Sequence, residues 1–137
     1  MSLDERGQVT AFVVAVVLAL FVMGGLVIDG GYTLAARRRA IDEANEAARA
    51  GAQAVDAAQY RATGILTLDP AAAVVAAEAH LRATGHAGAV TVAGDRVQVR
   101  AGITQPTALL QIVGIRDLTV SGQGAARIVS GIGGPAP

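Results

Sequence analysis

The pattern of apolar and polar positions changes once along the chain, near residue 29. Residues 11–28 are an uninterrupted run of 18 uncharged residues, and 13 of them are Phe, Val, Leu, Ile or Met. With Val9 and Thr10 added, the run makes about 30 Å of helix, which matches the hydrocarbon core of a bilayer. Those side chains contribute on the order of −4 to −8 kcal/mol on insertion scales, and no central charge opposes them. The pattern predicts a transmembrane helix over residues 9–29.

A cleavable signal peptide is the main alternative for this segment. Such peptides usually have a shorter apolar region, of roughly 7–15 residues, and a basic segment before it. Here the leader, residues 1–8, contains MSLDER, which is net acidic before the amino terminus is counted. We therefore interpret the run as a retained membrane anchor.

Two glycines and a carboxylate lie late in the apolar run. Gly24 and Gly25 are candidates for close helix packing, but their spacing is not a clean small-xxx-small pair, and simple tolerance of Gly in membrane helices is the favoured explanation. Asp29 ends the run, and this position indicates a solvated boundary residue, not a functional carboxylate inside the membrane.

Further boundary residues follow the run. Tyr32 and the basic group Arg37, Arg38 and Arg39 are expected at the membrane surface, where the Arg side chains can contact lipid headgroups on either side. The positive-inside rule counts these arginines and favours a cytoplasmic C-terminus.

Residues 30–58 keep a helical period but become amphipathic. One side carries Leu34, Ile41, Ala44, Ala48, Ala52 and Val55, and the other carries Asp42, Glu43, Glu46, Arg49 and Asp56. Because Ala has the highest helix propensity, we expect the helix to continue to about Ala58. Its Ala stripe can pack against the chain's own domain or against a neighbouring helix, and the sequence favours neither.

Residues 65–129 read as a small domain that begins with a helix. In LDPAAAVVAAEAHLRATG, Asp69 is the expected N-cap, Pro70 the first helical residue and Gly85 the stop. Glu78 and Arg82 form an i,i+4 pair on this helix.

The remainder of this domain predicts strands. AVTVAGDRVQVRA alternates its valines about a Gly-Asp turn, which is typical of a β-hairpin. Residues 107–113 can form a short helix, capped by Thr107 and closed by Gly114. DLTVSGQGAARIV supplies a last strand with Leu118 and Val120 on one face, in which Gly122 and Gly124 weaken the strand or mark a bulge.

The expected fold class is therefore α+β and membrane-anchored. A long N-terminal helix, transmembrane and then extramembrane, precedes a small domain with an antiparallel three-stranded sheet and one or two helices. Residues 130–137 are expected to be a loose tail.

Composition and charge argue against several functions. The 137-residue chain has no Cys, and all eleven basic residues are Arg, balanced by eleven Asp and Glu. Nothing in this balance points to nucleic acid, and no HExxH, GxSxG, P-loop or pair of catalytic carboxylates accompanies His80 and His86. We expect surface histidines, no metal, no cofactor and no enzymatic activity.

The segment DERGQVTAFVVAVVLALFVMGGLVIDGGYTLAARRRAIDEANEAARAGAQA resembles the N-terminal region of TadE/TadG-like proteins of Flp (Tad) pilus assembly, of the actinobacterial type. It has a charged leader with RG, one apolar span, DGGY, a basic patch and an Ala-rich helix ending in ARAGA. The resemblance implies a pilin-like fold and a minor pseudopilin-like or assembly subunit. It also implies a cytoplasmic N-terminus, a domain outside the cell membrane, and partners among other pilus or secretion-machine subunits, with homo- or hetero-oligomers formed through the N-terminal helix.

The resemblance also implies a candidate processing site. Prepilin-like members are cut after a Gly and carry Glu as the fifth mature residue, whereas a cut between Gly7 and Gln8 would place Phe12 there. A loop before the helix is the simpler interpretation of Gly7. A single-pass scaffold or sensor with no pilus role, and a membrane-tethered enzyme, remain as alternative functions.

Overall fold

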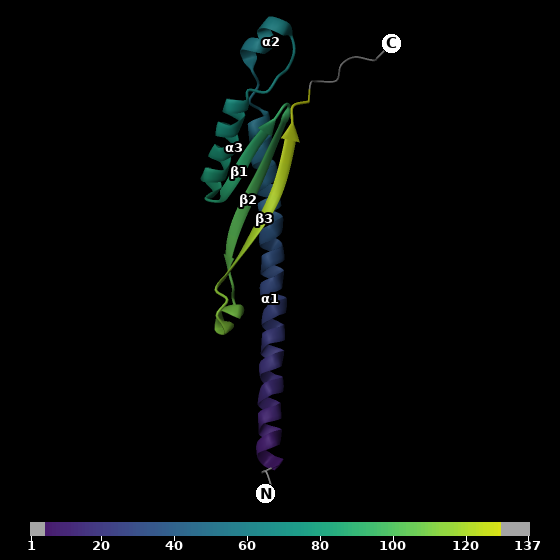
Figure 1. Ribbon diagram of the computed structural model, residues 1–137, viewed down its shortest axis with the longest axis vertical. Coiled ribbons are helices and arrows are strands. Elements are labelled where there is room, and N and C mark those ends of the chain that lie inside the picture. Colours follow the sequence, from purple (N-terminus) through teal and green to yellow (C-terminus); the bar gives the residue numbers. More distant parts are fainter. Residues whose placement is uncertain (1–4, 130–137) are drawn as a thin grey trace, which may run out of the picture. The chain divides into compact units, whose positions relative to one another are not determined.

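The computed structural model describes residues 5–129, so most of the predicted leader and all of the predicted tail, 130–137, lie outside the described residues. The elements follow the order α1 (Glu5–Ala52), α2 (Ala57–Thr63), α3 (Pro70–Thr84), β1 (Ala87–Ala93), β2 (Arg96–Pro106), the 3₁₀ helix η1 (Leu110–Val113) and β3 (Asp117–Arg127) (Figure 1). The described chain forms two compact units. The apolar unit holds α1 up to Ala35 together with Thr104–Leu118, and the sheet unit holds Ala36–Ile103 and the chain from Thr119 onward.

The sheet is antiparallel, with strand order β1-β2-β3. Its first two strands confirm the predicted hairpin, because Val90 pairs with Val99 and Val92 with Val97 in one register. Gly94 begins the two-residue turn with φ of 60°, a conformation that glycine adopts at little cost. The observed layout is the expected α+β one.

The core of the sheet unit lies on one face of the sheet. Along β2 the side chains alternate, and Val97, Val99, Ala101 and Ile103 are buried. Buried residues of α1 and α3 join the three N-terminal members of this row: Ala44, Ala47, Ala48, Ala73, Ala77 and Leu81. Both helices therefore cover the same face, and the other face is open (Figure 1).

Local capping explains the bounds of α3 and confirms the predicted signals. The Asp69 carboxylate accepts a hydrogen bond from Ala72 N–H at 3.0 Å, and Pro70 is the first helical residue. Gly85 ends the helix in the left-handed region with φ of 76°. Glu78 and Arg82 pair at 3.6 Å on the exposed side.

The helix α1 ends at Ala52, so the prediction that it continues to about Ala58 is wrong. Beyond it, Val55 makes an antiparallel bridge to Leu68, which draws the chain out of the helix. Asp56 then caps a separate helix, α2, by accepting hydrogen bonds from Ala58 N–H and Gln59 N–H. The helix propensity of alanine is therefore outweighed here by a side-chain cap and a tertiary β-bridge, which end α1 at Ala52.

The buried side of α1 is also shifted from the predicted one. Leu34, Ile41 and Val55 are at least 36% exposed, whereas Ala36, Ala40 and Ala47 are 3% exposed or less. Ala44 and Ala48 are fully buried in the chain's own core, and Ala52 packs at its edge. Packing within the chain thus accounts for the Ala stripe.

The glycines of β3 mark a close approach to α1, not a weak strand. β3 runs without interruption over Asp117–Arg127, and Gly122 and Gly124 face the helix. A Cβ atom at Gly122 would lie 2.2 Å from Ile41 N, and one at Gly124 would lie 2.3 Å from Asn45 N. Only residues without a Cβ allow the strand to lie this close to the helix backbone.

Candidate functional site: a buried carboxylate at the end of the apolar helix

The most distinctive polar side chain of the apolar unit is Asp29. Its Oδ1 accepts hydrogen bonds from the backbone N–H of Ala108 at 2.7 Å and of Leu109 at 3.4 Å. Its Oδ2 accepts from Leu109 N–H at 3.0 Å and from Leu110 N–H at 2.7 Å. Asp29 is only 2% exposed, so the expectation of a solvated side chain is wrong.

These bonds explain why a carboxylate can be buried here. The first N–H groups of a helix have no partner within the helix, and the N-cap of η1, Leu109, offers no side-chain acceptor. Asp29, about 80 residues earlier in the chain, accepts hydrogen bonds from three successive N–H groups and so supplies the cap that Leu109 cannot provide. Hydrogen bonds to an ionised acceptor are about twice as strong as neutral ones, which offsets the cost of burial.

The predicted cap of the short helix, Thr107, has another role. Its hydroxyl donates to the carbonyl oxygens of Ile115 and Arg116, and its N–H donates to the Arg116 carbonyl at 2.9 Å. The helix itself covers only Leu110–Val113 and is closed by Gly114, with φ of 91°. Thr107 therefore joins the two ends of a closed loop, residues 107–116, which we call the latch loop.

The latch loop also contacts the apolar part of α1. A Cβ atom at Gly25 would lie 3.1 Å from Leu109 Cβ, so this glycine is buried and gives room to the leucine. At Gly24 a Cβ would meet open space. A groove of about 400 Å³ is lined by Leu109 and by residues of α1: Val17, Leu20, Phe21, Gly24, Gly25 and Ile28.

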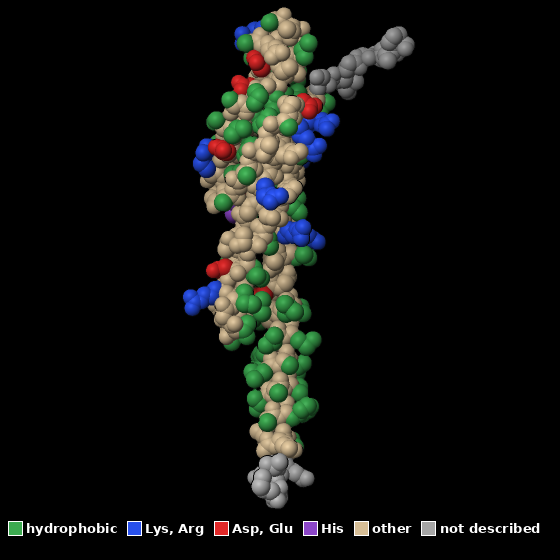
Figure 2. Space-filling model, in the orientation of Figure 1, with side chains coloured by type: hydrophobic (Ala, Val, Ile, Leu, Met, Phe, Trp, Pro, Cys, Tyr) green, Lys and Arg blue, Asp and Glu red, His purple; other side chains and the backbone are tan. Residues whose placement is uncertain are grey.

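The rest of the apolar run exposes its side chains. Phe12, Phe21 and Val27 are each at least 69% exposed, and Figure 2 shows hydrophobic side chains gathered along this part of α1. The helix is long and apolar enough, by length and composition, to cross a membrane. Soluble monomers rarely leave an apolar surface of this extent uncovered.

The predicted boundary and processing residues lie on α1. Tyr32 is 54% exposed, and Arg37, Arg38 and Arg39 are exposed in the sheet unit. Gly7 and Gln8 are exposed and already helical, so Gly7 does not lie in a loop before the helix.

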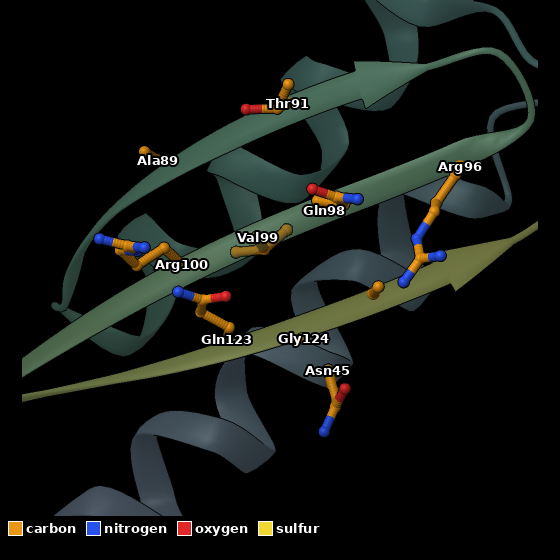
Figure 3. Close-up of a pocket in the computed structure, with 10 residues that line it drawn as sticks. Asn45, Ala89, Thr91, Arg96, Gln98, Val99, Arg100, Gln123 and Gly124 are labelled. Carbon is orange, nitrogen blue, oxygen red and sulfur yellow. The ribbon is translucent and has the colours of Figure 1, made fainter.

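The open face of the sheet carries a second candidate site. A groove of about 580 Å³ is lined by Thr91 of β1, by Arg96, Gln98 and Arg100 of β2, and by Gln123 of β3 (Figure 3). Its lining is polar and cationic and holds no carboxylate, histidine or thiol. The groove offers hydrogen bonds and positive charge, but no pair of a nucleophile and a base.

The histidines do not share a site. His86 Nδ1 lies 2.6 Å from Glu43 Oε2, and the two side chains are 29% and 22% exposed, so His86 is a half-buried partner of α1 and not a plain surface residue. Thr84 donates to the same carboxylate at 3.3 Å. Across residues 5–129 no group of three or more His, Cys, Asp or Glu is arranged to hold a metal ion.

Part of the chain matches a known protein family. Residues 7–54 match the family described as Putative Flp pilus-assembly TadE/G-like, and this stretch is the apolar run and the Ala-rich part of α1. No curated protein and no solved structure matches the chain. The match supports a role related to pilus assembly, in a family whose domains are structural and not catalytic. Together with the apolar helix it suggests a membrane location and contact with other pilus machinery.

Proposed function

We propose that this chain is a non-catalytic, single-pass membrane subunit of an Flp (Tad) type pilus machine, either a minor pseudopilin-like component or an assembly subunit. The observation that carries the proposal is the coincidence of the family match, residues 7–54, with the exposed apolar face of α1. A helix anchored in lipid and a small α+β domain are the parts that such a subunit needs.

In this proposal the N-terminus is cytoplasmic and the sheet unit is extracytoplasmic. Gln8 to Ile28 contains no acid, and Phe12 stands where a processed pilin-like chain carries Glu. A Glu at that place can neutralise a neighbour's new amino terminus in lipid, which this chain cannot do. The proposed subunit therefore stays uncut and acts through domain contacts and packing within the membrane.

Deletion of the gene tests the role. We expect cells without it to make and insert the major pilin but to lose surface pili, and the wild-type chain to restore them. Unchanged pilus number in the deletion strain would refute the assembly role. A secretion ATPase and a polytopic platform protein encoded beside this chain would support it further.

A single-pass scaffold or sensor with a cytoplasmic domain is the second candidate, because Arg37, Arg38 and Arg39 favour a cytoplasmic C-terminus. Protease treatment of intact cells that carry a C-terminal tag separates the two. Removal of the tag supports the pilus topology, and a tag cut only after lysis supports the scaffold. Mass spectrometry of the protected fragment reads the terminus, where a start at Gln8 would show that Gly7 is cut and contradict an uncut subunit.

A further inference from the structure

We propose that the latch loop, residues 107–116, is a second membrane contact that inserts into the headgroup region of the bilayer beside the end of the span, and that Asp29 holds it there. The inference rests on the membrane anchoring in the proposed function and adds to it a contact that the apolar run alone does not provide.

The exposed residues of the loop include three large aliphatic ones, and its exposed polar residues are Gln111 and Arg116. Ile112 is 82% exposed, Val113 57% and Ile115 45%. No charged residue occurs from Thr104 to Ile115, and Arg116 is the first charge after them. Three large exposed aliphatic side chains on one uncharged turn are typical of a surface that contacts lipid, and the next residue, Arg116, is exposed and carries a positive charge that suits anionic headgroups.

The contact of the loop with α1 determines how deep the loop lies in the bilayer. Leu109 contacts Gly25, which is three residues inside the end of the apolar run at Ile28. At roughly 1.5 Å per residue this contact lies about 5 Å below the end of the run, a depth at which interfacial elements insert. The groove lined by Leu109 and α1 continues the same apolar surface.

The backbone of the loop is prepared for a medium that offers little water. An unpaired N–H or carbonyl group is costly in lipid, and irregular backbone is tolerated there only when its groups are satisfied. Asp29 accepts from the N–H groups of Ala108, Leu109 and Leu110. At the other end, Gly114 N–H and Ile115 N–H donate to carbonyls within η1, and the Thr107 hydroxyl donates to two more carbonyls. A carboxylate that only marked the membrane boundary would need none of these contacts.

Site-directed fluorescence in lipid tests the proposal, because the natural chain has no Cys. The full chain, reconstituted in phosphatidylcholine and phosphatidylglycerol nanodiscs, carries one environment-sensitive label at Ile112→Cys or, as a second position, Val113→Cys. The matched control is Ile65→Cys, an isoleucine in the sheet unit that is 61% exposed. Leu18→Cys, 60% exposed in the middle of the apolar run, reports on the span itself.

We expect labels at 112 and 113 to be quenched by lipids with a nitroxide near the headgroup and to be shielded several-fold from aqueous iodide, relative to the label at 65. Quenching by iodide alone would overturn the inference. Shielding from both quenchers would also overturn it, since that pattern indicates that a second copy of the chain covers the loop. If the label at 18 is not quenched by lipids with a nitroxide deep in the acyl chain, the anchoring itself fails. If the label at 18 is quenched in this way but the labels at 112 and 113 are not quenched by the headgroup nitroxide, the inference alone fails.

The role of Asp29 is tested in the same preparation. Asp29→Ala should move the label at 112 from lipid to water and leave the label at 18 unchanged. Asp69→Ala is the matched control, because it removes a carboxylate that caps a helix of the sheet unit. A loop that stays in lipid without the Asp29 carboxylate would refute its role as the latch.

Discussion

The closest approach in the sheet unit gives the sharpest prediction about stability. Gly122 of β3 lies over the backbone of α1, and a Cβ atom there would be 2.2 Å from Ile41 N, 2.3 Å from the Ala40 carbonyl carbon and 2.6 Å from its oxygen. Real Cβ atoms do not come within 3.0 Å of such atoms. Because all three are backbone atoms of a helix, no side-chain rotation relieves the clash. Gly122→Ala therefore requires the strand to move.

The size of the movement sets the cost. Ordinary contact begins at 3.4 Å, so the strand must move away by about 1 Å. A gap of 0.5–1 Å loses roughly a quarter to a half of the van der Waals energy of each contact that it opens. The contacts of Val120 with Ala36 and Ala40 are the first ones affected. Overpacking of this kind costs about 1–3 kcal/mol, and we expect the upper end because the obstacle is rigid.

Gly102→Ala is the matched control on the neighbouring strand. There the nearest atom to a new Cβ is Ala87 O at 3.7 Å, which is ordinary contact. Alanine is favoured over glycine within a strand by about 0.5–1 kcal/mol, so this variant should be unchanged or more stable. Hydrogen exchange of the amides of β2, measured on the full chain in detergent, reads the free energy of opening. Equal protection of the β2 amides from exchange in Gly122→Ala and Gly102→Ala would show that β3 and α1 do not lie this close together.

Four further substitutions probe two helix caps, the core and an exposed ion pair. Asp69→Ala should cost about 1 kcal/mol by hydrogen exchange of α3, whereas Asp56→Ala should loosen only α2, which buries no residue; a global loss in the second variant would contradict this. Leu81→Ala should cost about 2–5 kcal/mol, since Leu81 is 3% exposed in the core, and a melting temperature like that of the wild type would contradict it. Glu78→Gln should change the melting temperature very little, because its pair with Arg82 is largely exposed; a clear fall would assign that pair a stabilising role.

Much of the fold could be predicted because its signals are local. Asp69, Pro70 and Gly85 determine the bounds of α3 through the first and last turn of the helix itself, and valine alternation determines the register of the hairpin. The end of α1 could not be predicted from propensity, because it depends on the bridge between Val55 and Leu68. The buried side of α1 could not be predicted for a related reason. It is set by β3, which crosses α1 at Gly122 and leaves room only for small residues there.

The candidate site was the least predictable part. Asp29 is about 80 residues from the amides that it binds, and nothing near it in the sequence indicates that contact. Its position at the end of an apolar run gave the opposite expectation, since most charges there are solvated. One signal was present in the sequence, because 104–115 is a second uncharged segment and is too short to cross a bilayer. An acid at the end of the apolar run and a later uncharged segment are together a reason to look for a loop folded back on the span.

The packing of α1 narrows where partners can bind. Ala44 and Ala48 are fully buried against β2 and α3, so a neighbouring helix cannot reach them unless the sheet unit opens. Leu109 packs against Gly25 and so also blocks a neighbouring helix from this glycine. Among the described residues proposed for helix packing, Gly24 keeps open space and lines the apolar groove. Association in the membrane is therefore expected to use the face of Gly24 and the exposed apolar side chains around it, whereas contacts of the sheet unit are left to its open, arginine-lined face.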